Sequence, residues 1–252
     1  MSTGINSILL TGWMAFRATL TLTLFVCVGS CIKDPGTVQP APTVTFNPTL
    51  PQGPLRILAL GDSYTIGQGV GTDDRFPHQT VALLKQMGRN FAEPEYIAAT
   101  GWTTANLLDA IARENKPKNY DVVTLLIGVN DQYQGREQAA YSTQFRQCLD
   151  QAIQHAGGRK ERVFVMSIPD YSVTPFARSL DKERIAKEID AFNSINRSIS
   201  LATSVNYIEI TVASRDAITD PTLVAADGLH PSAKEYRKWA EKLVARILTV
   251  LQ

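Results

Sequence analysis

Short apolar segments alternate with longer amphipathic segments along residues 55–252. This alternation is typical of strands that are each followed by a helix. The apolar segments are nearly continuous, as expected for parallel strands that helices cover on both faces. We therefore predict an α/β fold, a three-layer α/β/α sandwich with right-handed crossovers around a five-stranded parallel sheet. The predicted strands are residues 56–60, 95–99, 121–127, 162–168 and 205–210.

Two of the predicted helices have apolar residues that recur every three or four positions. Residues 138–156 form the first, and Cys148 lies on its apolar stripe, so we assign this cysteine to core packing rather than to catalysis. The second begins after Ser232 and continues to Leu251. Ser232 and Glu235 have the spacing of a capping box, in which two side chains bond two free N–H groups at the start of a helix.

The first 54 residues do not show this alternation. A basic residue, Arg17, precedes an apolar run at residues 18–29, and small residues follow, which is typical of a secretory signal. The run is too short to span a bilayer, since that takes about 20 apolar residues. We predict a signal peptide at residues 1–30, and the pattern fits a translation start at Met14 best.

The end of this signal, Val28–Cys31 (VGSC), resembles a bacterial lipoprotein box, in which cleavage occurs before a lipid-modified cysteine. Residues 31–54 hold six of the 13 prolines and few large apolar side chains, which is typical of a semi-rigid linker. We therefore predict an exported lipoprotein of the bacterial cell envelope, anchored to the membrane through Cys31, with a folded domain at residues 55–252. An ordinary signal peptide that happens to contain Cys31 is the alternative.

The composition is that of an ordinary globular protein, with 44% hydrophobic and 19% charged residues and a net charge of +1. We expect no nucleic-acid partner, because phosphate binding needs a clustered basic surface. His78, His155 and His230 are far apart in the sequence and no H-E-x-x-H motif is present, so we predict no metal or other cofactor. Cys148 is the single cysteine after Cys31, which excludes a disulfide within the domain.

Three candidate catalytic residues each follow a predicted strand. Ser63 follows the first strand, Gly101 the second and Asn130 the third. Ligands of such sheets bind beyond the carboxyl ends of the strands, so we expect these residues at one edge of the sheet. Asp227 and His230 lie three positions apart on a loop before the last helix, and we expect them to meet the others there.

These five residues supply what acyl transfer needs. A serine hydroxyl is a weak nucleophile until a histidine accepts its proton, and a carboxylate must hold the imidazole in the right tautomer. The negative charge that develops on the carbonyl oxygen needs hydrogen-bond donors nearby. The N–H groups of Ser63 and Gly101 and the side-chain amide of Asn130 would supply three, and the missing Cβ of Gly101 would let a substrate oxygen approach its backbone.

The segments around these residues resemble the four sequence blocks of the SGNH hydrolases, also called GDSL esterases/lipases. They read GDSYTIG, AATGWT, IGVND and DGLHP, in this order. The resemblance implies a flavodoxin-like fold, with Ser63 as nucleophile, His230 as general base and then acid, and Asp227 as the residue that orients His230. It implies an oxyanion hole formed by Ser63, Gly101 and Asn130. An ordinary α/β-hydrolase would need a G-x-S-x-G motif, which the chain lacks.

The resemblance covers about residues 55–250 and departs from the family in two places. Tyr64 stands where the naming motif has leucine, and Thr100, in the second block, stands where many relatives have serine. Asp62 and Asp131 adjoin the predicted catalytic residues, and we predict that they brace their loops.

Aromatic residues adjoin three of the blocks. Tyr64, Trp102 and Tyr133 are candidate substrate-binding residues, although such residues also pack locally. Lipids and polysaccharides are the substrates available to a lipoprotein of the cell envelope. We therefore expect a serine esterase that acts on small-acyl or lysophospholipid-type esters. A carbohydrate O-acetylesterase is the alternative with the same chemistry, and a catalytically idle surface glycan-binding module is the alternative from another class. The intact five-residue set argues against the binding module.

Overall fold

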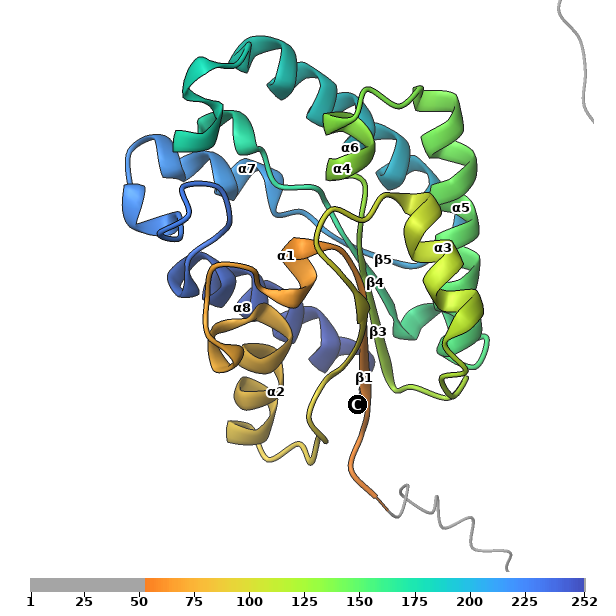
Figure 1. Ribbon diagram of the computed structural model, residues 1–252. Helices are drawn as coiled ribbons and strands as arrows, with labels where there is room; N and C mark the ends of the chain where they lie inside the picture. The colour runs from red at the N-terminus through yellow and green to blue at the C-terminus, as the bar shows by residue number, and fades with distance from the viewer. Residues whose placement is uncertain (1–52, 252) are drawn as a thin grey trace, which may run out of the picture. The chain divides into compact units, whose positions relative to one another are not determined.

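The structure is a computed structural model that describes residues 53–251 (Figure 1). The predicted signal peptide, the lipidation site at Cys31 and the linker up to residue 52 lie outside the described residues. Five parallel strands form one sheet in the order β2-β1-β3-β4-β5. The predicted five-stranded parallel sheet is therefore confirmed. The strands are β1 (Ile57–Gly61), β2 (Glu95–Ala98), β3 (Val122–Leu126), β4 (Val163–Met166) and β5 (Asn206–Ile208).

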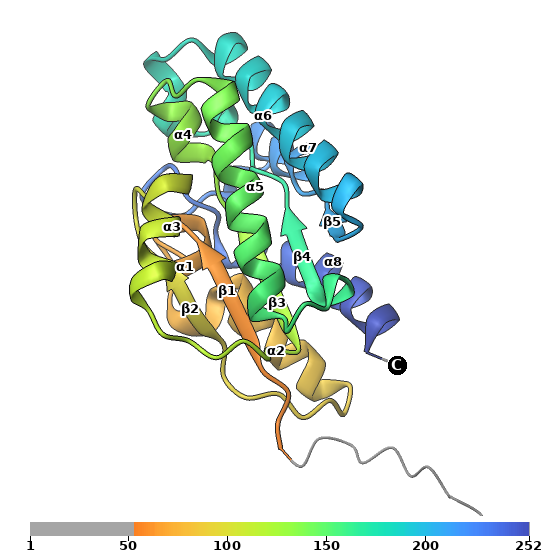
Figure 2. The same ribbon diagram turned by 90° about the vertical axis from the view of Figure 1, so that its right-hand side faces the viewer.

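Helices cover both faces of this sheet, so the predicted α/β/α layers are present (Figure 2). α3, α5 and α6 lie on one face, and α2 and α8 pack against each other on the other. The α-helices are α1 (Ser63–Ile66), α2 (Phe76–Gln86), α3 (Thr104–Arg113), α4 (Val129–Tyr133), α5 (Gln138–His155), α6 (Lys182–Thr203), α7 (Thr211–Ser214) and α8 (Ala233–Val250). Short 3₁₀ helices are η1 (Thr72–Asp74), η2 (Lys160–Arg162), η3 (Tyr171–Val173), η4 (Pro175–Ser179), η5 (Arg215–Ile218) and η6 (Pro221–Leu223).

The strands β1, β3 and β4 are buried along their whole length, which explains their continuous apolar sequences. The fifth strand is shorter than predicted, because the backbone leaves the sheet after Ile208. The N–H groups of Ile210 and Thr211 donate to the Ser167 side chain, at 2.8 and 3.1 Å, and α7 begins there. Cys148 is fully buried on α5, as its place on the apolar stripe predicts.

The last helix begins at Ala233, but only half of the predicted capping box is present. The Ser232 hydroxyl accepts from the N–H of Glu235 at 3.4 Å. The N–H of Ser232 donates instead to the carbonyl of Leu223 at 2.9 Å, and the Glu235 carboxylate accepts from the Trp239 indole at 2.8 Å. Because both groups already have other hydrogen-bond partners, the reciprocal bond does not form. Within residues 53–251, no helix combines the length and the apolar character needed to cross a membrane.

Candidate active site

Ser63 is presented by a tight turn between a strand and a helix. β1 ends at Gly61, where a Cβ atom would overlap the Thr65 side chain and the Leu126 carbonyl. Asp62 then caps α1, and its Oδ1 accepts from the N–H of Tyr64 at 3.0 Å. Ser63 is therefore the first residue of α1, directly beyond the carboxyl end of the second strand in the sheet order.

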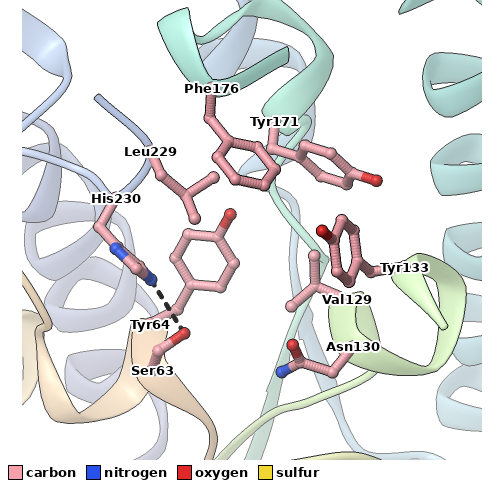
Figure 3. A pocket seen from close by; sticks show the side chains of 9 residues that line it. All are labelled: Ser63, Tyr64, Val129, Asn130, Tyr133, Tyr171, Phe176, Leu229 and His230. Atoms are coloured by element: carbon pink, nitrogen blue, oxygen red, sulfur yellow. Dashed lines mark hydrogen bonds between the residues drawn. The ribbon is translucent and has the colours of Figure 1, made fainter. Parts of the chain in front are cut away.

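The Asp227–His230 loop brings a carboxylate and an imidazole to this serine. Asp227 Oδ1 accepts from the N–H groups of Leu229 and His230, at 2.9 and 3.0 Å. Asp227 Oδ2 lies 2.7 Å from His230 Nδ1. On the other side of the ring, His230 Nε2 lies 3.0 Å from Ser63 Oγ (Figure 3). An ionised carboxylate can only accept, so this pairing favours the tautomer with the proton on Nδ1. Nε2 then has a free lone pair directed at the serine hydroxyl.

The protonation state of Asp227 fits this arrangement. Partial burial acts to raise the pKa of Asp227, but its hydrogen bonds with the N–H groups of Leu229 and His230 and with the imidazole lower the pKa below its ordinary value. Asp227 is therefore ionised at neutral pH and supplies a negative charge beside Nδ1.

The predicted oxyanion residues lie on neighbouring turns. Asn130 is on α4, and one N–H of its side-chain amide donates to the Trp102 carbonyl at 3.0 Å, which leaves its second N–H available. Gly101 lies on the turn after β2 with φ of +78°, a conformation that favours glycine. Asn130 lines the cavity beside Ser63, whereas Gly101 does not.

The Gly101 turn is also tied to Ser63. The hydroxyl of Thr100 donates to the Gln68 side chain at 2.6 Å, and the N–H of Gln68 donates to the Ser63 carbonyl at 3.0 Å. Thr100, which departs from the serine of many relatives, thus keeps a hydroxyl that connects the two loops.

Two buried aspartates brace these loops, as predicted. Asp131 accepts from the N–H and the hydroxyl of Thr104, at 2.9 and 2.6 Å, which joins the start of α4 to the start of α3. Burial raises the pKa of Asp131 and raises the pKa of Asp62 to about 8. Asp62 Oδ2 has no hydrogen-bond partner in the part of the chain that the structure describes. Hydrogen bonding therefore offsets only part of the free-energy cost of burying this carboxyl group.

A cavity of about 120 Å³ opens beside Ser63 (Figure 3). Three rings from different elements, Tyr133, Tyr171 and Phe176, pack with centroids 6.0 to 6.2 Å apart, and we call them the aromatic wall. They stand across the cavity from Ser63 and His230 (Figure 3). The lining residues are Ser63, Tyr64, Val129, Asn130, Tyr133, Tyr171, Phe176, Leu229 and His230.

Of the three predicted substrate-binding residues, two line the cavity and one does not. Tyr64 and Tyr133 line the cavity. Trp102 does not line it, because its half-buried side chain packs against the hydrophobic core and its carbonyl accepts the Asn130 amide. Sequence reasoning missed Tyr171 and Phe176, which follow β4. The carboxyl end of that strand lies at the same sheet edge, so applying the rule used for Ser63 to the fourth strand would have found them.

The other two histidines have structural partners. His78 Nδ1 lies 2.7 Å from the Tyr96 hydroxyl, and His155 Nδ1 lies 2.9 Å from the Pro117 carbonyl. Among residues 53–251, no group of three or more His, Cys, Asp or Glu side chains is placed to hold a metal ion.

Comparison with known proteins gives a family and a fold. The GDSL-like lipase/acylhydrolase family model matches residues 59–238. No curated protein matches the chain. Among solved structures, the chain is similar to a lipase/acylhydrolase from Enterococcus faecalis, with a TM-score of 0.60 and 21% identity over 77% of this chain and 95% of that chain. It is also similar to the lipase Lip_vut3 from a goat rumen metagenome, with a TM-score of 0.60 and 22% identity over 76% and 97% of the two chains.

A third similar structure is Axe2, described as an acetylxylan esterase from Geobacillus stearothermophilus. Its TM-score is 0.60, with 17% identity over 77% of this chain and 95% of that chain. At these identities the solved structures show a common fold, and they do not by themselves show a common substrate.

Proposed function

Because the chain belongs to the GDSL-like lipase/acylhydrolase family and is a carboxylic ester hydrolase, we propose that it cleaves esters with a Ser63–His230–Asp227 triad. One observation carries the proposal, the continuous contact from Ser63 Oγ to His230 Nε2 at 3.0 Å and from His230 Nδ1 to Asp227 Oδ2 at 2.7 Å. Ser63 and His230 are both buried and meet from positions 167 residues apart. A serine, a base and an orienting carboxylate in this order are what nucleophilic acyl transfer requires.

In the first half-reaction, His230 Nε2 accepts the proton of Ser63 as Oγ attacks the ester carbonyl carbon. The ionised Asp227 stabilises the positive charge that forms on the imidazole. The tetrahedral intermediate collapses, the bond from the carbonyl carbon to the alcohol oxygen breaks, and His230 gives its proton to the departing alcohol. Ser63 then carries the acyl group.

In the second half-reaction, water replaces the alcohol. His230 accepts a proton from the water, whose oxygen attacks the acyl carbon, and the bond to Ser63 Oγ breaks. His230 returns the proton to Ser63, and the carboxylic acid leaves. In both steps the oxyanion accepts hydrogen bonds from the N–H groups of Ser63 and Gly101 and from the free N–H of Asn130.

The size of the cavity supports a short acyl group. A cavity of about 150 Å³ holds a benzene molecule, so a space of about 120 Å³ holds a group of roughly four or five non-hydrogen atoms. This favours small-acyl esters over the long acyl chain of a lysophospholipid. It equally fits an acetyl group carried by a carbohydrate, so a carbohydrate O-acetylesterase is the second candidate, and the fold similarity to Axe2 is compatible with it.

We also propose that the protein is an exported lipoprotein of the bacterial cell envelope, anchored by a lipid on Cys31. The support is the sequence alone: a basic and apolar signal, the VGSC box and a proline-rich linker. Radiolabelled palmitate should enter the wild-type protein in a bacterial host and should not enter Cys31→Ser. Labelling that is equal in the two proteins would refute the anchor.

The function is tested with p-nitrophenyl esters from acetate to octanoate, acetylated xylan and a lysophospholipid. The wild-type protein should hydrolyse the short esters, and Ser63→Ala should not. Ser198→Ala, which removes an exposed hydroxyl on α6, is the matched control and should keep wild-type rates. If the wild-type protein and Ser63→Ala were equally inert on every ester, the glycan-binding alternative would replace the proposal.

A further inference from the structure

Two cavities meet beside the nucleophile. The first is the space of about 120 Å³ that opens next to Ser63. Next to it lies a second cavity of about 20 Å³, close to the volume that one water molecule needs. Four residues line both cavities, namely Tyr64, Tyr171, Leu229 and His230. These residues form the partition between the two spaces.

Tyr64 is the central part of this partition. Its side chain is 3% exposed, and its ring meets the His230 ring edge-on, with centroids 5.4 Å apart, and lies 6.3 Å from the Trp239 ring in the core. Its hydroxyl has no hydrogen-bond partner within residues 53–251 and points toward Phe176 and Leu229 (Figure 3). Packing alone therefore holds the ring in place.

Because Tyr64 is the next residue after Ser63 on α1, its ring lies at a fixed distance from the ester carbonyl that Ser63 attacks. Leucine, the residue of the naming motif at this position, is smaller and has no ring. The second cavity is lined by Pro169, Leu223 and Trp239 and also by polar residues that include Asp170 and Glu235. Its apolar side would suit a hydrocarbon chain if the ring were absent.

We propose that Tyr64 determines acyl-chain specificity, because its ring closes the cavity beside Ser63 and limits the accepted acyl group to about four carbons. The inference rests on the proposed function. The acyl half is the half that this space holds, since it stays bonded to Ser63 while the alcohol must leave after the first half-reaction. The substrate class is therefore esters of short carboxylic acids with an alcohol that extends into solvent.

Two substitutions separate the ring of Tyr64 from its hydroxyl. Tyr64→Leu removes the ring and joins the two cavities, whereas Tyr64→Phe keeps the ring and removes only the hydroxyl. Phe76→Leu is the matched control, because Phe76 packs on Trp239 at 6.1 Å and is fully buried but lines neither cavity. It weakens the same cluster of rings without opening the partition.

The experiment measures kcat/KM for p-nitrophenyl butanoate and octanoate with each purified protein. Tyr64→Leu should raise the octanoate-to-butanoate ratio about tenfold or more, because a pocket discriminates about tenfold or more for each methylene that does not fit. Tyr64→Phe and Phe76→Leu should keep the wild-type ratio within about threefold. If Tyr64→Leu melts below the assay temperature, Tyr64→Met replaces it, since the flexible methionine also lacks a ring.

A ratio that stays at the wild-type value in the variants without a ring would overturn the proposal, as would a ratio that rises equally in Tyr64→Phe. A parallel series of acetate esters with lengthening alcohols should show no change between wild type and Tyr64→Leu. A change confined to that series would assign the cavity to the alcohol and refute the acyl assignment. Failure of the proposed function is distinct, because Ser63→Ala would then hydrolyse butanoate as fast as the wild-type protein.

Discussion

On one side of the cavity, Ser63, His230 and Asp227 are joined by hydrogen bonds of 2.7 and 3.0 Å, whereas on the other side the aromatic wall is joined by ring contacts near 6 Å. Ser63 and His230 are buried, but Tyr133 and Phe176 are 57% and 41% exposed. Hydrogen bonds depend on direction, so they fix the atoms that react. Ring packing tolerates changes of shape, so it can set which substrate enters without altering the chemistry.

Removing the proposed nucleophile or the proposed base should give the largest effect. Ser63→Ala and His230→Ala should each lower kcat by about 10⁴-fold or more, because either substitution ends proton transfer to and from the attacking oxygen. The rates are measured on p-nitrophenyl acetate. His78→Gln is the control, since His78 bonds to Tyr96 and does not line the cavity, and it should keep the wild-type kcat. A triad variant within about tenfold of the wild-type kcat would contradict the assignment.

Removing one oxyanion donor should give the next largest effect. Asn130→Ala should lower kcat by about 10²–10³-fold with little change in KM, because the amide hydrogen bond strengthens as the oxyanion forms. Steady-state kinetics on the same ester separates the two constants. A change in KM alone would mean that Asn130 binds the ester equally in the ground state and the transition state, which would exclude it as an oxyanion donor.

Substituting Asp62, the residue before Ser63, should change how the free energy of unfolding depends on pH. Burial raises the pKa of Asp62 to about 8, so between roughly pH 4 and pH 8 the folded protein keeps a proton that the unfolded chain has released. The stabilisation from this proton is complete below about pH 4 and is lost as the pH rises toward 8. Asp62→Asn keeps an acceptor for the N–H of Tyr64 but cannot titrate.

The free energy of unfolding of Asp62→Asn should therefore fall less between pH 5 and pH 8 than that of the wild-type protein, by at least about 1.4 kcal/mol, the equivalent of one pKa unit. Urea denaturation at the two pH values measures it. Asp131, whose charge also acts to raise the pKa of Asp62, is present in both proteins. Equal changes in the two proteins would show that Asp62 is ionised in the folded state throughout this range.

Trimming the aromatic wall should give the smallest effect. Phe176→Ala should raise KM for p-nitrophenyl butanoate by roughly three- to tenfold and leave kcat within about threefold, because an exposed ring contributes binding that is the same before and during reaction. A fall in kcat as large as that in Asn130→Ala would mean that the aromatic wall helps to position the reacting atoms. The contrast between the two sides of the cavity would then be wrong.

The strands and the positions of the candidate site residues could be predicted from the sequence because their signals are local. A strand that helices cover on both faces is apolar throughout, and a residue that follows such a strand lies at a known edge of the sheet. Ser63, Gly101 and Asn130 each follow a strand in this way, while Asp227 and His230 form their hydrogen bonds within one loop. These inferences need no knowledge of distant partners.

The errors arose where a distant partner decided the outcome. Ser167, on another segment, takes the N–H groups of Ile210 and Thr211 and shortens β5. The carbonyl of Leu223, on η6, accepts the N–H of Ser232 that the capping box would have used. The choice between core packing and cavity lining for Trp102 and Tyr64 likewise depended on which neighbours each ring met in the folded protein.

The sequence by itself determined the order of strands and helices, the family blocks and the residue types available for acyl transfer, because periodicity and turn chemistry act over a few positions. Only the tertiary structure decided the volume of the cavity, its aromatic wall and the partition at Tyr64. These features come from side chains on four separate segments, at residues 63–64, 129–133, 171–176 and 229–230. Their spacing in the fold is set by packing between helices and sheet, and no local pattern in the chain encodes it.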